Sequence, residues 1–508
     1  MKVILIQPPR KYWPYLNEGD NYILPLWMPC LAAICLQKKY QIICIDCMSQ
    51  KIGWNSLSKI LAKEKPDVVG VSESHSLYIE EGLHLVKLIK KISPQTKVIA
   101  GGGHYSNQYK FLLPKYPIDF IVIGEGEHTF DELLTAIENN QKNYSSIKGI
   151  TYLENNNIVV TNPRPLIENL DELPFPAYHL MPMDRYGTSK YLFSPGGITI
   201  SHSRGCLHRC SFCSWWPQMA ERTINDGKEK LTPKWRSKSV TRTITEIEYL
   251  INNFNKKFFI FVDGTWNIDS EWNLQFSEQI IKKNLDIKWF SFVRADCLQR
   301  DEKNGTLKKM VTAGLAHICV GIEHSNPKTL ESFSKVNSSF EMTKKTLDIF
   351  HKHYPQVFLQ GTFIIGHKNE SQESLDILSR QVKKLKLDFP AFHALTPVPG
   401  TEIYEQMLQD KKIEVTDFGK YDWNTPIMGS DYLSREELAY NIYLLYKRTI
   451  SCWWFLKGIF SPYKYKRNLY IWWVMVTIKV FLSDIKRNFF SNKDNKSFKL
   501  VIPKWYNT

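Results

Sequence analysis

The sequence predicts an α/β protein in which an open parallel sheet is followed by a partial β/α barrel and a helical region. With 508 residues, the chain is longer than one hydrophobic core usually serves, so we expect two or three domains. Short Val- and Ile-rich runs alternate with helical patterns in residues 1–140 and again in residues 196–410. This alternation is typical of parallel strands covered by helices. Residues 411–508 are predicted to be helical, basic and rich in aromatic side chains.

Residues 1–140 are predicted to form a Rossmann-like domain. Its expected strands cover residues 3–6, 42–45, 68–71, 98–100 and 120–123, and its expected helices cover residues 27–36, 57–63, 79–89 and 127–137. Ligands of such a sheet bind at the carboxyl ends of its strands. Gly101, Gly102 and Gly103 remove every β-carbon at one strand end, so a bulky planar or nucleotide-like group could lie against the backbone there. Ordinary turn chemistry is the alternative for each glycine.

Residues 141–195 are predicted to connect the two blocks, through a strand pair at 147–153 and 157–160 and an extended, proline-rich segment at 173–186. Residues 196–410 repeat the strand and helix pattern six times, which predicts a partial (β/α)6 barrel of the TIM type. The expected strands cover residues 198–201, 258–262, 288–292, 317–322, 358–365 and 392–396, and the expected helices cover residues 243–252, 270–283, 339–351, 371–384 and 402–408. The chemistry of such barrels lies at the carboxyl ends of the strands.

The loop after the first barrel strand carries Cys206, Cys210 and Cys213. Three thiolates within eight residues can converge on one metal centre. They leave a four-coordinate zinc ion or a cubane iron–sulfur cluster one protein ligand short, and a chemically active centre needs that open position. A structural metal site with a distant fourth ligand, and unrelated buried thiols, are the alternatives.

The other seven cysteines stand mostly alone in apolar runs, which argues against a disulfide framework and predicts a reducing, cytoplasmic location. No signal peptide is expected, because residues 1–7 form a short strand-like run that ends at Pro8 and Pro9. The net charge of +15 favours an anionic partner, either nucleic acid or a membrane surface.

Most of the excess charge lies in the tail, since residues 441–508 contain thirteen Lys or Arg against two acids, Asp484 and Asp494. The apolar run at 469–482 has 14 residues and includes Lys479, so it is too short and too charged to span a bilayer. Tryptophans in this tail alternate with cations, which predicts interfacial helices at the inner face of the membrane. These residues are Trp453, Trp454, Trp472 and Trp473 with Lys457, Lys464, Lys466, Arg467, Lys486 and Arg487.

Two alternatives for the tail stay open. It could be an amphipathic helix packed on the barrel or on a dimer partner, or it could bind nucleic acid through stacked aromatic rings. Nucleic acid is disfavoured, because no recognisable RNA-binding module accompanies the tail.

In this setting the cysteine triplet resembles the motif of the radical S-adenosylmethionine (SAM) superfamily, and the resemblance extends from residue 1 to about residue 410. It implies that Cys206, Cys210 and Cys213 bind a 4Fe-4S cluster, and that an electron donor of flavodoxin or ferredoxin type drives cleavage of SAM to a 5'-deoxyadenosyl radical. It also implies SAM contacts near the triplet and at the barrel strand ends, although the usual Gly-Gly-Glu is absent after the second strand. The alternatives are a core role for Phe212 and surface roles for the charged residues of this set. The implied contacts are Phe212, Asp263, Thr265, Arg294, Glu323 and Gly366.

The N-terminal strand ends resemble the cobalamin-binding domain of one subgroup of this superfamily. The shared features are Pro8-Pro9, a serine after the third strand, the glycine run and the Ile-Gly-Glu-Gly-Glu element at 123–127. The loop after the first strand lacks the Asp-x-His-x-x-Gly motif that supplies a histidine to cobalt in other cobalamin domains. We therefore expect cobalamin bound without a lower histidine. The implied contacts are Asp46, Ser72, Gly101, Gly102, Gly103, Gly124 and Glu125.

Segments 213–218 and 235–240, with Glu246, look like those of enzymes of hopanoid side-chain assembly and, more distantly, of the anaerobic magnesium-protoporphyrin monomethyl ester cyclase. The resemblance implies hydrogen abstraction from an unactivated C–H bond of an apolar lipid or isoprenoid-like substrate, followed by methylation, ring formation or rearrangement. The polar insert at 219–233 suggests a different substrate from those relatives.

Three rival functions stay open. One is modification of a small polar metabolite or peptide. Another is an RNA-modifying enzyme of the methylthiotransferase type, which is disfavoured because the N-terminal cysteines do not lie on the loops that its second cluster requires. The third is an electron carrier, which would need no barrel. The N-terminal cysteines are Cys30, Cys35, Cys44 and Cys47.

Overall fold

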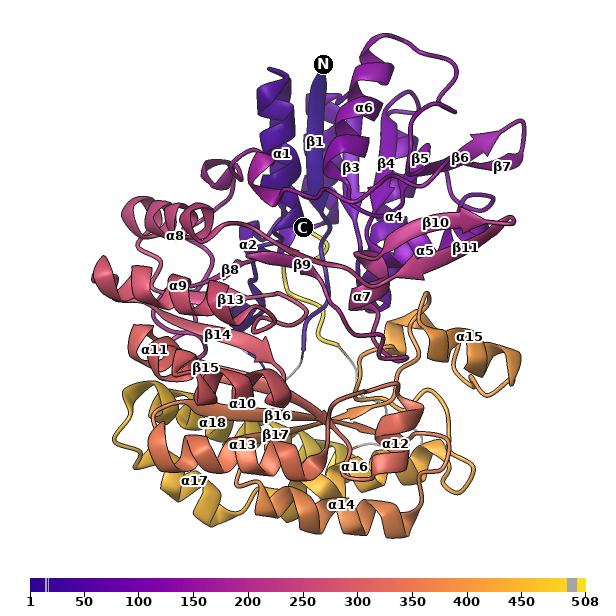
Figure 1. Ribbon diagram of the computed structural model, residues 1–508. Coiled ribbons are helices and arrows are strands. Elements are labelled where there is room, and N and C mark those ends of the chain that lie inside the picture. Colours follow the sequence, from indigo (N-terminus) through magenta and orange to yellow (C-terminus); the bar gives the residue numbers. More distant parts are fainter. Residues whose placement is uncertain (14–15, 17, 491–499) are drawn as a thin grey trace.

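The computed structural model describes residues 1–13, 16, 18–490 and 500–508. Figure 1 shows two large sheets, an N-terminal one in indigo and purple and a second one in pink and orange, with the C-terminal helices in yellow beside the second sheet. The predicted α/β class, with an open sheet followed by a barrel-type sheet and a helical C-terminal region, is confirmed.

The first sheet has the strand order β2-β1-β3-β4-β5-β6-β7. Strands β1 to β5 are parallel and buried on both faces, which explains their continuous apolar composition. Helices α1 and α6 cover one face, and α3 and α4 cover the other. The strands are β1 (Lys2–Gln7), β2 (Gln41–Asp46), β3 (Val68–Ser72), β4 (Lys97–Gly101) and β5 (Phe120–Val122). The helices are α1 (Trp27–Gln37), α2 (Cys47–Gln50), α3 (Trp54–Glu64), α4 (Ile79–Ile92), α5 (Gly103–Leu112) and α6 (Glu127–Glu138).

The strand pair that the sequence predicts between the two blocks is present as β6 (Ile150–Glu154) and β7 (Asn157–Val160). Strand β6 pairs with β5 in antiparallel fashion, with Ile121 opposite Thr151, so the pair extends the first sheet. Helix α5 was not predicted, because its polar composition and its glycine start hide the helical pattern.

The second sheet is the predicted six-stranded partial barrel, with the order β17-β16-β15-β14-β13-β8 and every neighbouring pair parallel. Its last strand begins three residues before the predicted position, because Pro390 lies inside it; proline is tolerated on an edge strand. The strands are β8 (Gly197–Ile200), β13 (Phe258–Phe261), β14 (Lys288–Val293), β15 (Leu315–Glu323), β16 (Phe358–Ile365) and β17 (Phe389–Ala394). The helices are α8 (Val240–Phe254), α9 (Ser270–Lys282), α10 (Ala295–Lys303), α11 (Thr306–Ala313), α12 (Pro327–Ser332), α13 (Phe340–His353), α14 (Gln372–Lys384) and α15 (Glu402–Gln409).

Short elements separate β8 from α8. Strand β9 (Ser203–Gly205) pairs with β12 (Trp235–Ser237), and helix α7 (Trp215–Gln218) lies between them in the chain. The polar insert forms the hairpin of β10 (Glu221–Asn225) and β11 (Lys228–Thr232), most of whose residues are exposed.

The C-terminal region forms α16 (Arg435–Thr449), α17 (Cys452–Ile459) and α18 (Lys464–Phe490). Helix α18 packs against the barrel sheet through Tyr465, Leu469 and Tyr470. Within the described residues, no helix has the length and apolar composition needed to cross a bilayer. The last residues return to the first domain, where the backbone of Val501 pairs with that of Tyr12.

The predicted interfacial role is wrong for two of the four tail tryptophans. Trp472 is buried and donates its Nε1–H to Asp20 Oδ2 at 3.0 Å, while the ring of Trp473 stacks on Phe389 at 3.7 Å between centroids. These two aromatic side chains of α18 therefore pack inside the protein, whereas Trp453 of α17 is 79% exposed. Lys486, Arg487, Asp484 and Asp494 of the predicted tail surface have side chains outside the described part of the chain.

A buried group of four charges joins the two domains. Arg204 of β9 and Arg236 of β12 lie directly opposite each other, and like charges in that position repel. Glu125, from the first domain, lies between them and accepts from Arg204 Nη1 and from Arg236 Nη1, each at 2.9 Å. Arg204 also binds Glu127. Although burial alone would raise the pKa of Glu127, the guanidinium of Arg204 holds it below its usual value.

We expect Glu125→Gln to lower the free energy of unfolding by about 3–5 kcal/mol, because removing one member of a buried ion pair leaves uncompensated charge. Here two guanidinium groups would face each other. Denaturant unfolding followed by circular dichroism measures the change. The matched control is Asp376→Asn, which breaks an exposed pair with Arg448 and should cost less than about 1 kcal/mol. Equal effects of the two substitutions would contradict the role given to Glu125.

Candidate active site

The cysteine loop is held in place by Asp263, which follows β13. Its Oδ1 accepts hydrogen bonds from the backbone N–H of His202 at 3.1 Å and of Ser203 at 2.5 Å, and from Ser203 Oγ at 2.6 Å. His202 Nδ1 lies 3.1 Å from the same oxygen. The sequence suggested Asp263 as a SAM ligand, but this oxygen is engaged by the turn that leads into the cysteine loop. Asp263 Oδ1 therefore positions the loop, while Oδ2 is buried and has no hydrogen-bond partner among the described residues, so its predicted contact with SAM stays a prediction.

The three thiols are partly buried, and none of them forms a disulfide bond. Burial raises the pKa of Cys210 to about 11, and it also raises the pKa of Cys213. A negative charge on Cys213 would raise the pKa of Cys210 further, and one on Cys206 would do the same for Cys213, so the sulfur atoms form one electrostatic group. Thiolates crowded in this way are stabilised by a metal centre. The donor set fits an iron–sulfur cluster bound by three cysteines.

Four predicted SAM contacts lie at the barrel strand ends or next to the thiols in the chain. Thr265 Oγ1 lies 3.6 Å from Cys206 Sγ. Arg294 binds Asp296 and donates to the carbonyl of Val336 at 2.8 Å. Gly366 has a φ of +99°, a conformation that glycine adopts without strain. Phe212 packs edge-to-face on Phe333 at 5.2 Å between centroids, in a small apolar cluster. This contact agrees with the alternative that Phe212 is a core residue.

Glu323, at the end of β15, has a buried partner that the sequence did not indicate. Lys335 Nζ lies 2.9 Å from Glu323 Oε1, and Thr362 Oγ1 donates to Glu323 Oε2 at 3.4 Å. Both charged residues act on the pKa of Cys210, where the cation lowers it and the carboxylate raises it. The pair therefore lies beside the thiols. No sequence pattern marks Lys335, because it lies in a loop twelve residues after Glu323.

A cavity of about 820 Å³ lies between the carboxyl ends of the first sheet and the start of the barrel. Gln218 and Trp215 of α7 and Ser201 and His202 after β8 contribute the barrel side of its wall. All seven residues predicted to contact cobalamin line it. They are Asp46, Ser72, Gly101, Gly102, Gly103, Gly124 and Glu125.

The glycines of this wall have different roles. A Cβ at Gly124 would meet nothing within 4 Å, so this residue offers open backbone to a ligand. At Gly103 a Cβ would lie 2.3 Å from Gln218 Nε2, and at Gly102 it would lie 2.7 Å from the backbone of Glu73. Gly102 and Gly103 therefore permit close packing of protein against protein. From the sequence, the same glycines were interpreted as room for a ligand. The open backbone at Gly124 and the cavity beside it fit a large cofactor at this strand end.

The two predicted carboxylate contacts are both engaged within the protein. Asp46 caps α2 and accepts from Ser49 Oγ and from Tyr186 OH, each at 2.7 Å. Glu125 belongs to the charged group that joins the domains. Each shapes the wall of the cavity rather than presenting a free carboxylate.

His75, which the sequence prediction did not include, also lines the cavity. It lies three residues after Ser72, the residue at the end of β3 that the sequence predicted as a contact. His75 is exposed where it lines the cavity, but the surrounding protein desolvates it, and this desolvation together with the charge of Arg10 lowers its pKa to about 4. The imidazole is therefore neutral near neutral pH.

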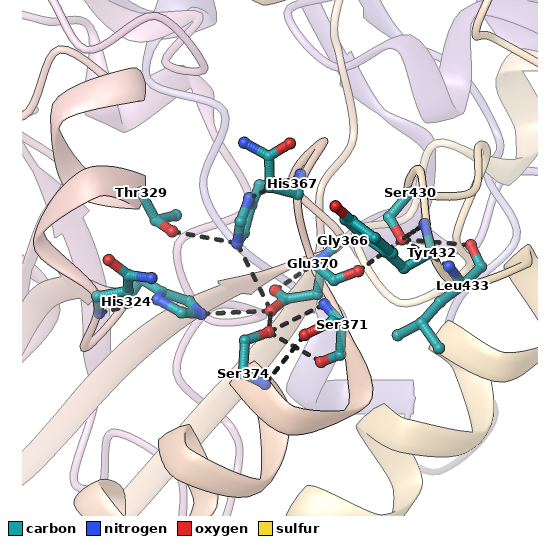
Figure 2. A network of polar contacts seen from close by, with 12 residues as sticks. His324, Thr329, Gly366, His367, Glu370, Ser371, Ser374, Ser430, Tyr432 and Leu433 are labelled. Carbon is teal, nitrogen blue, oxygen red and sulfur yellow. Dashed lines mark hydrogen bonds and ion pairs between the residues drawn. The ribbon is translucent and has the colours of Figure 1, made fainter.

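A second polar cluster follows β15 and β16, where His324, His367 and Glu370 lie together (Figure 2). Glu370 Oε1 is 3.6 Å from His324 Nε2 and 3.5 Å from His367 Nε2. Each Nδ1 accepts a backbone N–H, from Asn326 at 3.0 Å and from Asn369 at 3.2 Å. In a neutral ring the proton must then be on Nε2, which faces Glu370 in both histidines and in His367 also lies 3.1 Å from Thr329 Oγ1 (Figure 2).

This tautomer disfavours a metal ion, because a metal-binding Nε2 needs a free lone pair and usually an Nδ1–H that donates. Burial alone would raise the pKa of Glu370, but the two histidines hold it at about 2. Glu370 also accepts from Gly366 N at 3.3 Å and from Ser374 Oγ (Figure 2). The cluster thus fastens the ends of two barrel strands to the start of α14.

Two families match the chain. Residues 12–134 match the B12 binding domain, and residues 200–380 match the radical SAM superfamily. An uncharacterized methyltransferase of Pyrococcus horikoshii is 30% identical over 443 residues, which cover 86% of this chain and 90% of that protein. The anaerobic magnesium-protoporphyrin IX monomethyl ester cyclase of Rubrivivax gelatinosus is 28% identical over 500 residues, covering 96% and 84%.

Among solved structures, the radical SAM methyltransferase TsrM from Kitasatospora setae, with cobalamin and a 4Fe-4S cluster bound, superposes with a TM-score of 0.69 at 14% identity. The match covers 95% of this chain and all of that one, so the two share a fold. The domain matches, the relatives and the fold agree with the site's donor set. The chain belongs to the radical SAM superfamily, within the group of enzymes whose barrel follows an N-terminal B12-binding domain.

Proposed function

We propose that this enzyme uses a 4Fe-4S cluster, SAM and cobalamin to modify an unactivated carbon of an apolar, lipid or isoprenoid-like substrate, by methyl transfer or by ring formation. The observation that carries the proposal is the cavity that the strand ends of the first sheet share with the segment leading to the cysteine loop. A cofactor held by the first domain would therefore lie opposite the segment that leads to the cysteine loop of the barrel.

When bound, the cluster supplies the electron that splits SAM into methionine and a 5'-deoxyadenosyl radical, and cobalamin supplies a methyl carrier. Cys206, Cys210 and Cys213 would hold the cluster. Thr265 and Glu323 would orient SAM, with Lys335 balancing the charge of Glu323. Because these side chains are largely buried, they would also keep water away from a reactive radical.

The apolar substrate class has two supports. Much of the cavity wall is apolar, including Leu24, Trp27 and Ile198. Relatives named for magnesium-protoporphyrin IX monomethyl ester and for bacteriochlorophyllide d carry the names of large, mainly apolar ring systems. A small polar substrate is the second candidate, and a relative named cytidylyl-2-hydroxyethylphosphonate methyltransferase, 22% identical over 80% of this chain, favours it.

An apolar substrate agrees with contact between α17 and an anionic membrane. Trp453, Leu456 and Phe460 follow a helical spacing and are 79%, 45% and 78% exposed. Lys457 lies among them and is exposed as well. This surface, and not Trp472 and Trp473, would meet the inner face of the membrane.

We expect anaerobic reconstitution to give about four irons per chain, as one cubane cluster requires. Replacing Cys206, Cys210 and Cys213 together with Ala should remove nearly all of this iron, because no sulfur ligand of the loop is left. Iron analysis and the visible absorption spectrum measure the loss. Cys297→Ala, which changes a thiol outside the loop, serves as the control and should keep the cluster. A triple variant with full iron content would overturn the assignment.

Turnover with SAM and a reductant should distinguish the two reaction types. Methyl transfer to carbon should produce 5'-deoxyadenosine and S-adenosylhomocysteine together, since one SAM initiates the radical and another supplies the methyl group. Ring formation or rearrangement should produce 5'-deoxyadenosine alone. Quantitative chromatography of both products is the measurement, and the triple cysteine variant is the control. A preparation that contains its iron–sulfur cluster but forms neither product would refute the proposed function.

The double variant Trp453→Ser and Phe460→Ser should reduce binding to vesicles that contain phosphatidylserine by at least tenfold, because it removes two large side chains from the proposed contact. Co-sedimentation measures the bound fraction. Substitutions are preferable to truncation, since α18 belongs to the protein core. Tyr432→Ser, at an exposed aromatic residue away from α17, is the control. Unchanged sedimentation of the double variant would exclude this surface as a membrane contact.

A further inference from the structure

The loop after β3 and the loop after β1 leave the same edge of the first sheet, side by side. Strands β1 and β3 are neighbours in the first sheet, with Ile6 opposite Val71, so their carboxyl ends lie side by side. The sequence prediction excluded a lower histidine because the loop after β1 lacks one. The adjacent loop, after β3, carries His75.

The loop after β1 supports its neighbour instead. Arg10 forms an ion pair with Glu73, and its guanidinium lies over the ring of Tyr78 at 4.5 Å from the centroid. Glu73 Oε1 accepts the backbone N–H of His75 at 3.2 Å, and the backbone of Glu73 lies against Gly102. The backbone of His75 is thereby fixed between the end of β3 and the glycine run.

His75 differs from the other histidine that lines the cavity. His202 lies against Asp263 and packs in a tilted arrangement on Trp272, at 4.0 Å between ring centroids, so its ring serves packing. The ring of His75 forms no hydrogen bond with any residue in the described part of the chain. Its one ring contact there is edge-to-face with Trp423, at 5.4 Å between centroids. An imidazole whose nitrogen atoms are not engaged by the described protein residues, and which lines a cavity, is available to bind a metal.

We propose that an imidazole nitrogen of His75 would bind the cobalt ion of cobalamin held in this cavity. This inference rests on the proposed cofactor and replaces the expectation of cobalamin without a lower histidine. Trp423, which follows the barrel and also lines the cavity, would orient the imidazole through its ring contact.

The test is electron paramagnetic resonance of the cobalt(II) state, with full-length protein that is uniformly labelled with nitrogen-15 and loaded with unlabelled cobalamin. Coordination by His75 should split the cobalt lines into doublets. The dimethylbenzimidazole base of the cofactor would split them into triplets, because its nitrogen is nitrogen-14. His75→Ala should lose the doublet and still retain cobalt after desalting. His128→Ala, which alters an exposed histidine that does not line the cavity, should keep the doublet.

Triplets, or lines without nitrogen splitting, in the wild-type protein would overturn the assignment of His75 while leaving the cofactor in place. A doublet that persists in His75→Ala would overturn it too, since another protein nitrogen would then be the ligand. A wild-type protein that retains no cobalt would overturn the proposed cofactor together with this inference. The cobalt content measured before each spectrum separates these failures.

Discussion

The placement of the two domains depends on one buried group of charges, in which Glu125 separates Arg204 from Arg236. Two guanidinium groups on facing strands would repel each other without a carboxylate between them. That carboxylate comes from the other domain, so β9 and β12 can pair in this way only while the first sheet is docked. Because Arg204 lies two residues before Cys206, the interaction that joins the domains also fixes the start of the cysteine loop above the cavity.

The carboxylates around the site mainly hold its architecture. Asp46 caps a helix, Asp263 fixes the turn before the cysteines, and Glu370 ties two barrel strands to α14. A buried carboxylate must be hydrogen-bonded or paired, so each of these groups restricts the geometry around it. The loops that carry the candidate ligand-binding residues are thus positioned by a set of polar contacts. The open surface of the cavity consists of backbone atoms and a few side chains.

Much of the site could be predicted because strand ends can be recognised in a sequence. A run of Val and Ile that stops at a glycine or a polar residue marks the carboxyl end of a parallel strand, and ligands bind there. The cysteine loop, Ser72 and Gly124 can be predicted in this way, and Ser72 and Gly124 line the cavity. It missed Lys335, since a residue in a loop reaches Glu323 only through the folded path of the chain.

The sequence by itself determined the order of strands and helices, the cysteine triplet and the family, because these depend on local periodicity and on short motifs. Only the tertiary structure decided what each polar side chain does. Glu125 and Asp263 have the residue type of ligands but are engaged by partners more than 40 residues away. The backbone of His75 is held by Glu73, which pairs with Arg10 from the loop after β1. The same holds for Trp472, whose amphipathic helix packs on protein. Periodicity shows which face of an element is apolar, whereas the identity of the surface that covers it depends on contacts between distant segments.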